Sequence, residues 1–184
     1  MTTATAPRTA VGTWTIDSAH SNVEFAVKHM MVSTVKGRFH GVQGTFAIDE
    51  AQPERSSITA SVDVASVDTG VGQRDEHLRS DDFFNAEKYP QFAFQSTRIE
   101  KDGGGWKLTG DLTIRDITRS VVFDVEFDGR GVDAYGKDRA GFSAETKINR
   151  RDFGVHWNGL IEAGGVVVSD TVRISLNISA VRQD

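Results

Sequence analysis

An alternation of apolar and polar residues with a period of two runs through most of this chain and constrains its fold more than any other feature. Successive residues of a strand point to opposite faces of a sheet, so each alternating segment has one dry face and one wet face. The dry-face residues, segment by segment, are Val23, Phe25 and Val27; Val42, Phe46 and Ile48; Ile58, Ala60, Val62 and Val64; Phe92 and Phe94; Trp106, Leu108, Leu112 and Ile114; Val121, Phe123, Val125 and Phe127; Phe142, Ala144 and Ile148; and Val172, Ile174, Leu176 and Ile178. The pattern predicts about eight strands, several of them long.

Turn signals separate these segments at residues 102–105, 128–131 and 164–165, each of which contains two or more glycines. No amphipathic helix of ordinary length lies between the strands, which argues against a parallel βαβ architecture. An antiparallel sheet with one dry face must cover that face, either by closing into a barrel or by pairing with a second sheet. The residues therefore predict an all-β fold of antiparallel strands, and leave barrel and sandwich both open.

The exception to the alternation is the stretch RDEHLRSDDFF, residues 74–84, which lies in the longest connection between strands. Residues 73–82 contain no glycine, no proline and no alternation, which favours a short helix followed by a turn. Asp75 and Arg79 stand four residues apart with the acid first, a spacing that stabilises helices. Such a connection is expected to lie over one end of a barrel. The helix would place four side chains on one face: Arg74, His77, Leu78 and Asp81.

Composition limits the partners and the chemistry. The chain has 184 residues, which suits a single domain, and its net charge of -5 without any basic block argues against nucleic acid as a partner. It has no cysteine, which excludes disulfides, thiolate catalysis and cysteine-ligated zinc. The absence of disulfides also favours a cytoplasmic location.

The first residues, MTTATAPRTAVG, lack the charged start and apolar run of a secretory signal. No apolar run reaches the ~20 residues that a membrane-spanning helix needs. We therefore expect a flexible tail over residues 1–12, one barrel domain over residues 13–184, a cytoplasmic location and no stable insertion in a membrane. A secretory protein that has lost its signal is the alternative.

Motifs for catalysis and for metal binding are weak. The five histidines include no pair at the spacing of zinc ligands, and no serine stands in a G-x-S-x-G turn. Residues 70–75, GVGQRD, lack the third glycine of a nucleotide-binding loop, although an anion contact at this helix start stays open. The carboxylates crowded near arginines in residues 74–84 are more typical of a structural ion network. The residues predict no metal and no cofactor.

Phenylalanine is abundant, with 11 residues, and those on the dry face of the alternating segments include Phe25, Phe46, Phe92, Phe94, Phe123 and Phe142. An eight-stranded barrel can fill its interior with such side chains or hold one small ligand among them. Periodicity does not distinguish these two cases, so a ligand cavity and a solid core both stay open at this point.

Longer motifs resemble a known family. The stretch WTIDSAHSNVEFAVKHMMVSTVKGRF, residues 14–39, is similar to the YceI-like family of bacterial lipocalin-like, polyisoprenoid-binding proteins. Four further stretches match the same family in the same order: RDEHLRSDDFF, YPQFAFQST (89–97), GDLTIRDITRSV (110–121) and RRDFGV (150–155). Together they cover nearly all of the chain from Trp14 onward. One departure is Asp116, where many members have glycine in the sequence LTIRGVT.

The resemblance implies an extended, eight-stranded antiparallel lipocalin-like β-barrel with one or two short helices and a long apolar tunnel. It implies a non-catalytic carrier that binds a polyisoprenoid or a similar lipid, such as a polyprenyl chain or an isoprenoid quinone. Members are often dimeric, so a homodimer is an open option. Such a ligand exposes a large apolar area in water, and its burial stabilises the complex by about 25 cal/mol per Å².

The alternation within each strand and the family resemblance together predict a set of ligand-contacting residues. The wall of the tunnel is predicted to include Phe25, Val27, Phe46, Phe92, Phe94, Leu112, Ile114, Phe123 and Phe142. The mouth is predicted to include His29, Met30, Met31, Arg74, His77, Leu78, Phe83 and Phe84. Two other functions stay open. One is an enzyme that acts on a small apolar substrate with His77 and a nearby acid, and the other is a solid barrel that acts through its surface.

Overall fold

The computed structural model describes residues 11–161 and 165–183, and the fold consists of β-strands with one α-helix. The strands are β1 (Val11–Ile16), β2 (Asn22–His29), β3 (Ser33–Phe39), β4 (Val42–Asp49), β5 (Ser57–Asp63), β6 (Val67–Asp68), β7 (Gln91–Asp102), β8 (Gly105–Ile114), β9 (Ile117–Val132), β10 (Asp138–Asn149), β11 (Leu160–Ile161), β12 (Gly165–Val166) and β13 (Val168–Arg182). The helix is α1 (Gly72–Arg79), and short 3-10 turns η1 to η4 cover Ser18–His20, Pro53–Arg55, Val64–Ser66 and Arg150–Phe153.

The main sheet closes into a barrel because the last strand, β13, pairs with three others. It pairs with β10 along one edge and with both β1 and β2 along the other, in each case antiparallel. Since Trp14 lies opposite Arg182 and Val23 lies opposite Leu176, β1 and β2 form one long strand interrupted at η1.

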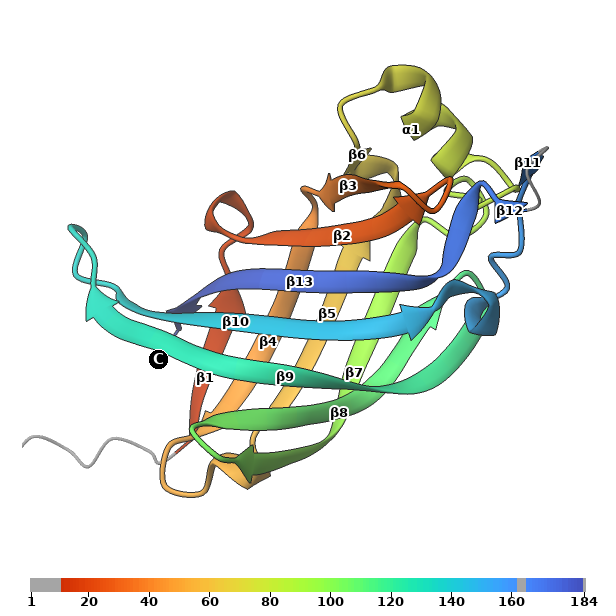
Figure 1. Cartoon of the computed structure of the whole chain (residues 1–184). Helices are drawn as coiled ribbons and strands as arrows, with labels where there is room; N and C mark the ends of the chain where they lie inside the picture. The colour runs from red at the N-terminus through yellow and green to blue at the C-terminus, as the bar shows by residue number, and fades with distance from the viewer. Residues whose placement is uncertain (1–10, 162–164, 184) are drawn as a thin grey trace, which may run out of the picture.

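The next two long strands are interrupted in the same way. β3 and β4 follow β2 and β1 on the other side, and β6 and β5 pair with β3 and β4 respectively. Counting each interrupted pair once, the barrel has eight antiparallel strands, as predicted. In Figure 1, β4, β5 and β7 cross behind β9, β10 and β13 at a steep angle.

The alternating sequence becomes the two surfaces of this barrel. In β1, residues Gly12, Trp14 and Ile16 are buried and their neighbours are not. The buried apolar side chains form two separate clusters. One gathers around Phe83, Leu112, Phe123 and Phe153, and the other around Trp14, Val42, Phe46 and Ala180.

Trp14 fills the barrel end at which β1 meets β13. Its ring is buried, and the guanidinium carbons of Arg130 and Arg182 lie 5.3 and 5.9 Å from its centroid. Both arginines also pair with Glu50, at 3.1 and 2.9 Å. A side chain at Gly12 would have its Cβ 3.0 Å from the Arg182 guanidinium carbon, so glycine leaves the space in which Arg182 lies. Stacked cations and aromatic surface thus seal this end of the barrel.

One predicted turn is confirmed and another is wrong. β7 and β8 turn at residues 103–104, with Gly103 in the left-handed region at φ 56°. Residues 128–131 are not a turn, because β9 continues through them to Val132 and the chain reverses at residues 133–137. The glycines instead serve a β-bulge. The pairing of β9 with β10 shifts between Phe142 and Gly141, and Gly129 has φ 145°. At the third predicted turn, Gly165 opens β12, and residue 164 lies outside the described residues.

The predicted helix is present, but its predicted ion pair is not. α1 begins at Gly72 and ends at Arg79, before Asp81. Arg79 pairs with Glu76 at 2.6 Å instead of with Asp75. Asp75 is buried and turns back to accept hydrogen bonds from the backbone N–H and the hydroxyl of Thr69, at 2.8 and 2.6 Å. Its carboxylate fastens the start of the helix to Thr69, the residue after β6, a role that helical spacing alone does not indicate.

Two further expectations concern the flexible tail at the N-terminus and a membrane-spanning helix. Of the expected tail over residues 1–12, residues 1–10 lie outside the described part, whereas Val11 and Gly12 belong to β1. Within residues 11–161 and 165–183, no helix is long and apolar enough to cross a bilayer.

Asp17 predicts a pH dependence of stability. It joins β1 to η1, and hydrogen bonds from Arg139 and then His20 lower the pKa of its carboxyl from 3.8 to about 2. The folded state therefore favours the carboxylate. The associated stability is complete above about pH 4 and is lost as the pH falls toward 2. Solvent screening of this partly exposed group limits the contribution to about 1 kcal/mol.

We expect the free energy of unfolding, measured by urea titration, to fall between pH 4 and pH 2 by about 1 kcal/mol more in the wild type than in Asp17→Asn. Asp111→Asn, at an exposed carboxyl on β8, is the matched control and should follow the wild type. Parallel curves for the wild type and Asp17→Asn would contradict this role.

Candidate functional site

The interior of the barrel contains a cavity of about 490 Å³, within the range of ligand pockets in proteins. All eight long strands contribute to its walls, together with α1 and the segment after it. The walls are almost entirely aliphatic and aromatic. Residues of both hydrophobic clusters line the cavity. The cavity therefore lies between the two clusters, where a solid core would otherwise join them.

Of the predicted ligand-contacting residues, all but two line the cavity. From the wall set these are Phe25, Val27, Phe46, Phe92, Phe94, Leu112, Ile114, Phe123 and Phe142, and from the mouth set His29, Arg74, His77, Leu78, Phe83 and Phe84. Whether they contact a ligand stays a prediction.

Met30 and Met31 are placed differently from the prediction. They occupy the turn between β2 and β3, both with left-handed backbone at φ 49° and 63°, and both side chains are exposed. The alternation that points Val27 and His29 into the barrel ends at this turn. The methionines therefore project outward and are not among the residues lining the cavity.

Several residues that line the cavity were not predicted from the sequence to contact a ligand. The dry face of β13 and the start of β2 were assigned to the core without being predicted to contact a ligand, and Trp157 and Val155 lie in an irregular segment that has no periodicity. The missed liners include Val23, Phe39, Trp106, Leu108, Val125, Phe153, Val155, Trp157, Val172, Ile174, Leu176 and Ile178. For the strand residues other than Phe39, the same alternation that placed their neighbours on the dry face was a sufficient signal.

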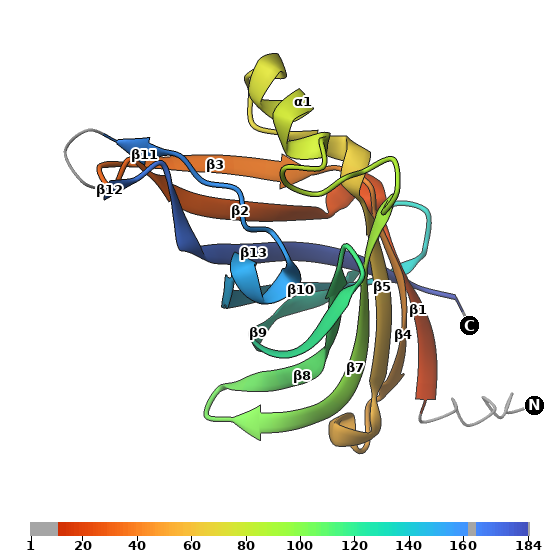
Figure 2. The ribbon, with the colours of Figure 1, turned by 90° about the vertical axis from the view of Figure 1, so that its right-hand side faces the viewer.

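A cap segment, residues 72–86, covers one side of the cavity. It comprises α1 and the turns after it, and it lies outside the strands next to β6 (Figure 1, Figure 2). Leu78, Phe83 and Phe84 point from it into the cavity. The ring of Phe84 lies 5.2 Å from that of Phe92 and 6.0 Å from that of Phe39, so the cap packs on the strands through aromatic contacts.

Arg115 fastens this cap to the barrel. It is the first residue of the two-residue turn between β8 and β9 and has φ 56°, an unfavourable backbone for a long side chain. Its guanidinium donates to the backbone oxygens of Asp81 and Phe83 and to the Asp81 carboxylate, each at 2.8 Å. The bond from Arg115 lowers the pKa of the Asp81 carboxyl. The neighbouring Asp116, in place of the family's glycine, leaves the hairpin intact.

The cationic and imidazole side chains that line the cavity gather at its cap end. Arg74 donates to the hydroxyl and backbone oxygen of Thr69, at 2.7 and 2.9 Å, which leaves its Nη1 without a bond to a described residue. His77 contacts the Asp82 carboxylate at 2.8 Å through Nε2, and its ring packs edge-on against Phe83 and Trp157. The bond to Asp82 lies within the cap, and the ring contact with Trp157 joins the cap to the irregular segment after β10.

Arg150 is buried at the same end, where η4 begins. Its guanidinium donates to the backbone oxygens of Val155, Trp157, Val168 and Ser169 at 2.8 to 3.3 Å. Burial lowers the pKa of this group, although the carboxylate of Asp170 acts in the opposite direction. Arg150 therefore links the irregular segment after β10 to β13, and its bonded N–H groups hold these two segments together.

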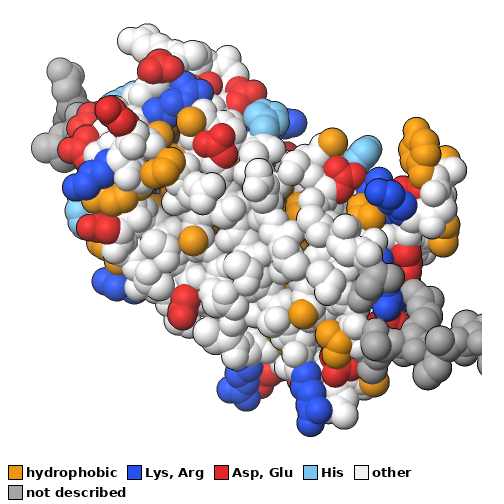
Figure 3. Space-filling model, turned by 180° about the vertical axis from the view of Figure 1, so that it is seen from behind, with side chains coloured by type: hydrophobic (Ala, Val, Ile, Leu, Met, Phe, Trp, Pro, Cys, Tyr) orange, Lys and Arg blue, Asp and Glu red, His pale blue; other side chains and the backbone are white. Residues whose placement is uncertain are grey.

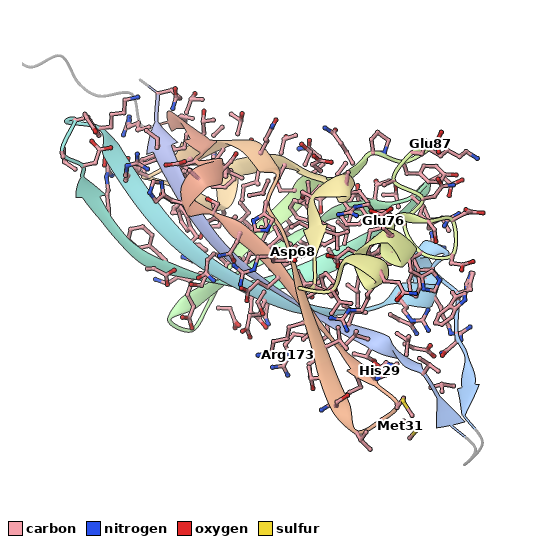
Figure 4. All side chains as sticks on the ribbon, turned by 90° about the horizontal axis from the view of Figure 1, so that it is seen from above. His29, Met31, Asp68, Glu76, Glu87 and Arg173 are labelled. Carbon is pink, nitrogen blue, oxygen red and sulfur yellow. The ribbon has the colours of Figure 1, made fainter. Side chains whose placement is uncertain are left out.

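His29 differs from these residues, because its ring makes no hydrogen bond within the described part of the chain. It ends the inward-facing row of β2 and lines the cavity near the turn that carries the methionines (Figure 4). Among the described residues, no three His, Asp or Glu side chains come close enough together to hold a metal ion.

The anchoring by Arg115 can be tested directly. In Arg115→Ala we expect a loss of about 2 kcal/mol in the free energy of unfolding, because charge-assisted bonds to two carbonyls and a carboxylate are removed. We also expect faster amide hydrogen exchange in residues 78–86. The control is Arg119→Ala on the same hairpin, where the guanidinium bonds, among the described residues, only to the neighbouring carbonyl of Thr118. Unchanged exchange in the cap would contradict the anchoring role.

Comparisons with known proteins agree with this architecture. The family model described as "YceI-like domain" matches residues 14–180. Protein YceI of Escherichia coli is 41% identical over 139 residues, which cover 76% of this chain and 73% of that protein. A UPF0312 protein of Pectobacterium atrosepticum is 40% identical over 139 residues, 76% of this chain and 72% of that protein.

Solved structures share the barrel. BcnA of Burkholderia cenocepacia superposes with a TM-score of 0.77 at 27% identity, over 89% of this chain and 98% of that one. The YceI protein of Campylobacter jejuni gives 0.73 at 34% identity, over 85% and 90%. A polyisoprenoid-binding domain from Saccharophagus degradans gives 0.68 over 92% and 98%, and its 15% identity makes the likeness one of fold alone.

Proposed function

This chain belongs to the YceI-like family, and on that premise we propose that it is a non-catalytic carrier that holds a long isoprenoid lipid inside its barrel. The observation that carries the proposal is the apolar cavity of about 490 Å³ enclosed by all the long strands. A structure of the same fold is described as a polyisoprenoid-binding domain, which supports the same ligand class here.

The chemistry of the walls suits such a ligand. An isoprenoid chain offers no hydrogen-bonding groups along its length, so its binding depends on burial of apolar area rather than on directed contacts. The aromatic and branched aliphatic liners supply that environment. A non-catalytic role is supported by the bonding of two ionisable groups at the walls, since the buried Arg150 donates to backbone oxygens and His77 is paired with Asp82.

The polar end of the cavity suits the head of the lipid. Arg74 retains free N–H groups at Nη1, and His29 has an unbonded ring, both relative to the described residues. These groups can donate to the oxygen of a polyprenyl alcohol or phosphate, or to the carbonyl oxygen of an isoprenoid quinone. We therefore propose an orientation with the head near His29 and Arg74 and the tail directed toward Trp106 and Val125 at the far end.

Native mass spectrometry of the protein purified from its host without lipid removal tests the function. We expect a bound mass that organic extraction releases as an isoprenoid lipid. Stripped protein should rebind a prenyl quinone with quenching of its tryptophan fluorescence, because Trp106 and Trp157 line the cavity. A clean apo mass, an extract without lipid and no quenching by prenyl quinone would together sink the proposal.

A pair of substitutions on one strand tests the location of the ligand. Ala60 on β5 faces the cavity, and the adjacent Thr59 is exposed on the outer face. We expect Ala60→Phe to weaken prenyl quinone binding at least tenfold, because its ring occupies the volume that the tail needs. Thr59→Phe introduces the same ring on the outside and should bind as the wild type does. Circular dichroism confirms the fold of both, and equal affinities would place the ligand elsewhere.

A further inference from the structure

The turn between β2 and β3 exposes three consecutive apolar residues, which we call the tip: Met30, Met31 and Val32. These residues are 43%, 67% and 83% exposed. Isolated apolar side chains are common on protein surfaces, but a run of three at the end of a projecting hairpin is not. Val166 of β12, also exposed, lies on the neighbouring hairpin, and the two hairpins project from the same end of the barrel (Figure 2).

The tip is an ordered turn. The backbone N–H of Met30 donates to Val167 at 2.8 Å, and that of Val32 donates to His29 at 3.2 Å. Met30 and Met31 both adopt left-handed backbone, a conformation that costs energy in residues other than glycine, asparagine and aspartate. The fold thus holds large apolar side chains in solvent at a position where a small polar residue would be more stable.

The tip adjoins the cavity. His29 directly precedes the tip, and the backbone oxygen of Val167 accepts the hydrogen bond from Met30. Both residues line the cavity. Figure 4 shows His29 on β2 beside the turn that carries Met31. An apolar tip and the polar end of the cavity therefore lie within a few residues of each other.

Cations accompany the tip on the outer face of the barrel. Lys147 on β10 lies opposite Arg173 on β13, Arg173 lies opposite Ala26 on β2, and Ala26 lies opposite Lys36 on β3. This register places three cations in one row across four strands, with Lys28 nearer the tip.

The basic row is not neutralised locally. Its three cations, Lys36, Lys147 and Arg173, form no ion pair with any residue in the described ranges, and Lys28 donates to the hydroxyl of Thr34. Glu24 and Glu145 occupy the next row away from the tip, and Asp170 of β13, on the tip side of Arg173, is paired with Arg151 at 2.7 Å. By contrast, cations and acids are interspersed on the face shown in Figure 3. In a chain of net charge -5, the row is a local exception.

From these contacts we infer that the tip docks reversibly on an anionic lipid bilayer, with Met30, Met31 and Val32 among the acyl chains and the basic row at the phosphates. The inference rests on the proposed function, because a carrier of a membrane lipid must receive and release its ligand at a membrane. Docking at this point brings the bilayer to the polar end of the cavity.

The dimensions fit this arrangement. Strands rise about 3.3 Å per residue, so Lys28 lies roughly 10 Å and Lys36 roughly 17 Å from Met31 along the hairpin. An apolar segment that sinks about 5–10 Å below the head groups would bring these cations to the level of the lipid phosphates or just above it. Each cation near an anionic leaflet strengthens binding about fivefold at low salt.

Vesicle flotation tests the inference with the full chain. We expect the protein to float with vesicles of phosphatidylcholine containing phosphatidylglycerol, to float far less with pure phosphatidylcholine, and to dissociate as salt is raised. In Met30→Asn/Met31→Asn, asparagine tolerates the left-handed backbone, and the apolar side chains are removed. This variant should bind the anionic vesicles at least tenfold more weakly. Lys36→Gln/Lys147→Gln/Arg173→Gln should bind on the order of 100-fold more weakly at low salt.

Matched controls exist at the opposite end of the barrel. Arg55→Gln/Lys101→Gln/Lys137→Gln makes the same change in net charge at exposed cations that have no ion pair among the described residues. Val132→Thr/Tyr135→Ser removes apolar side chains that are 72% and 89% exposed. Both controls should float as the wild type does. Flotation of the tip variant equal to the wild type, an equal loss in the controls, or no flotation of the wild type would overturn the inference. The last result would favour a protein partner for the tip.

Failure of docking and failure of the proposed function give different results. A protein that retains an isoprenoid in native mass spectrometry but never floats is a carrier without this membrane contact. A protein that floats through its tip but carries and rebinds no isoprenoid has the docking surface without the proposed cargo. The tip variants should bind prenyl quinone in detergent with unchanged affinity, because Met30 and Met31 do not line the cavity.

Discussion

The pairing of β13 with the interrupted strand formed by β1 and β2 is the constraint on which the rest of this structure depends. It joins the last strand of the chain to the first, and it converts an open sheet into a closed barrel. Without it, backbone groups along both edges would lack partners, and the dry faces of all the strands would be open to water. Every property of the interior follows from this closure.

The closed barrel is too wide for its own side chains to fill. The buried residues gather into two clusters on opposite parts of the wall, and the space between them stays open as the cavity. A protein interior normally packs as densely as an organic crystal, so a lasting apolar void gives up attractive contacts that a ligand can restore. An apolar lipid is the kind of molecule that restores them without requiring polar partners along its length.

Charge is used in this protein mainly to hold segments in place. Arg115 fastens the cap, Arg150 ties the irregular segment after β10 to β13, and Arg182 covers Trp14 at the closed end. In each case a planar guanidinium bridges groups that are far apart in the sequence, which an ammonium cannot do as well. The basic row on the outer face differs because its side chains have no such partner among the described residues. That contrast separates a surface available for binding from cations engaged in the fold.

The amino-acid sequence by itself determined one alternating segment in each of the eight barrel strands, the dry faces of those segments, the short helix and most of the cavity wall, because a period of two assigns each residue to a face before any pairing is known. It did not indicate β1 or β3, which complete the first two interrupted strands. It misplaced the turn at residues 128–131, since glycine serves a bulge as readily as a turn. It also paired Asp75 with Arg79, whereas the carboxylate of Asp75 is directed to Thr69 outside the helix. Only the tertiary structure decided that the lumen is open, that Met30 and Met31 point away from it, and that Lys36, Lys147 and Arg173 form one row. The reason is physical: such features depend on the distances between strands that are remote in the chain, and local periodicity carries no information about those distances.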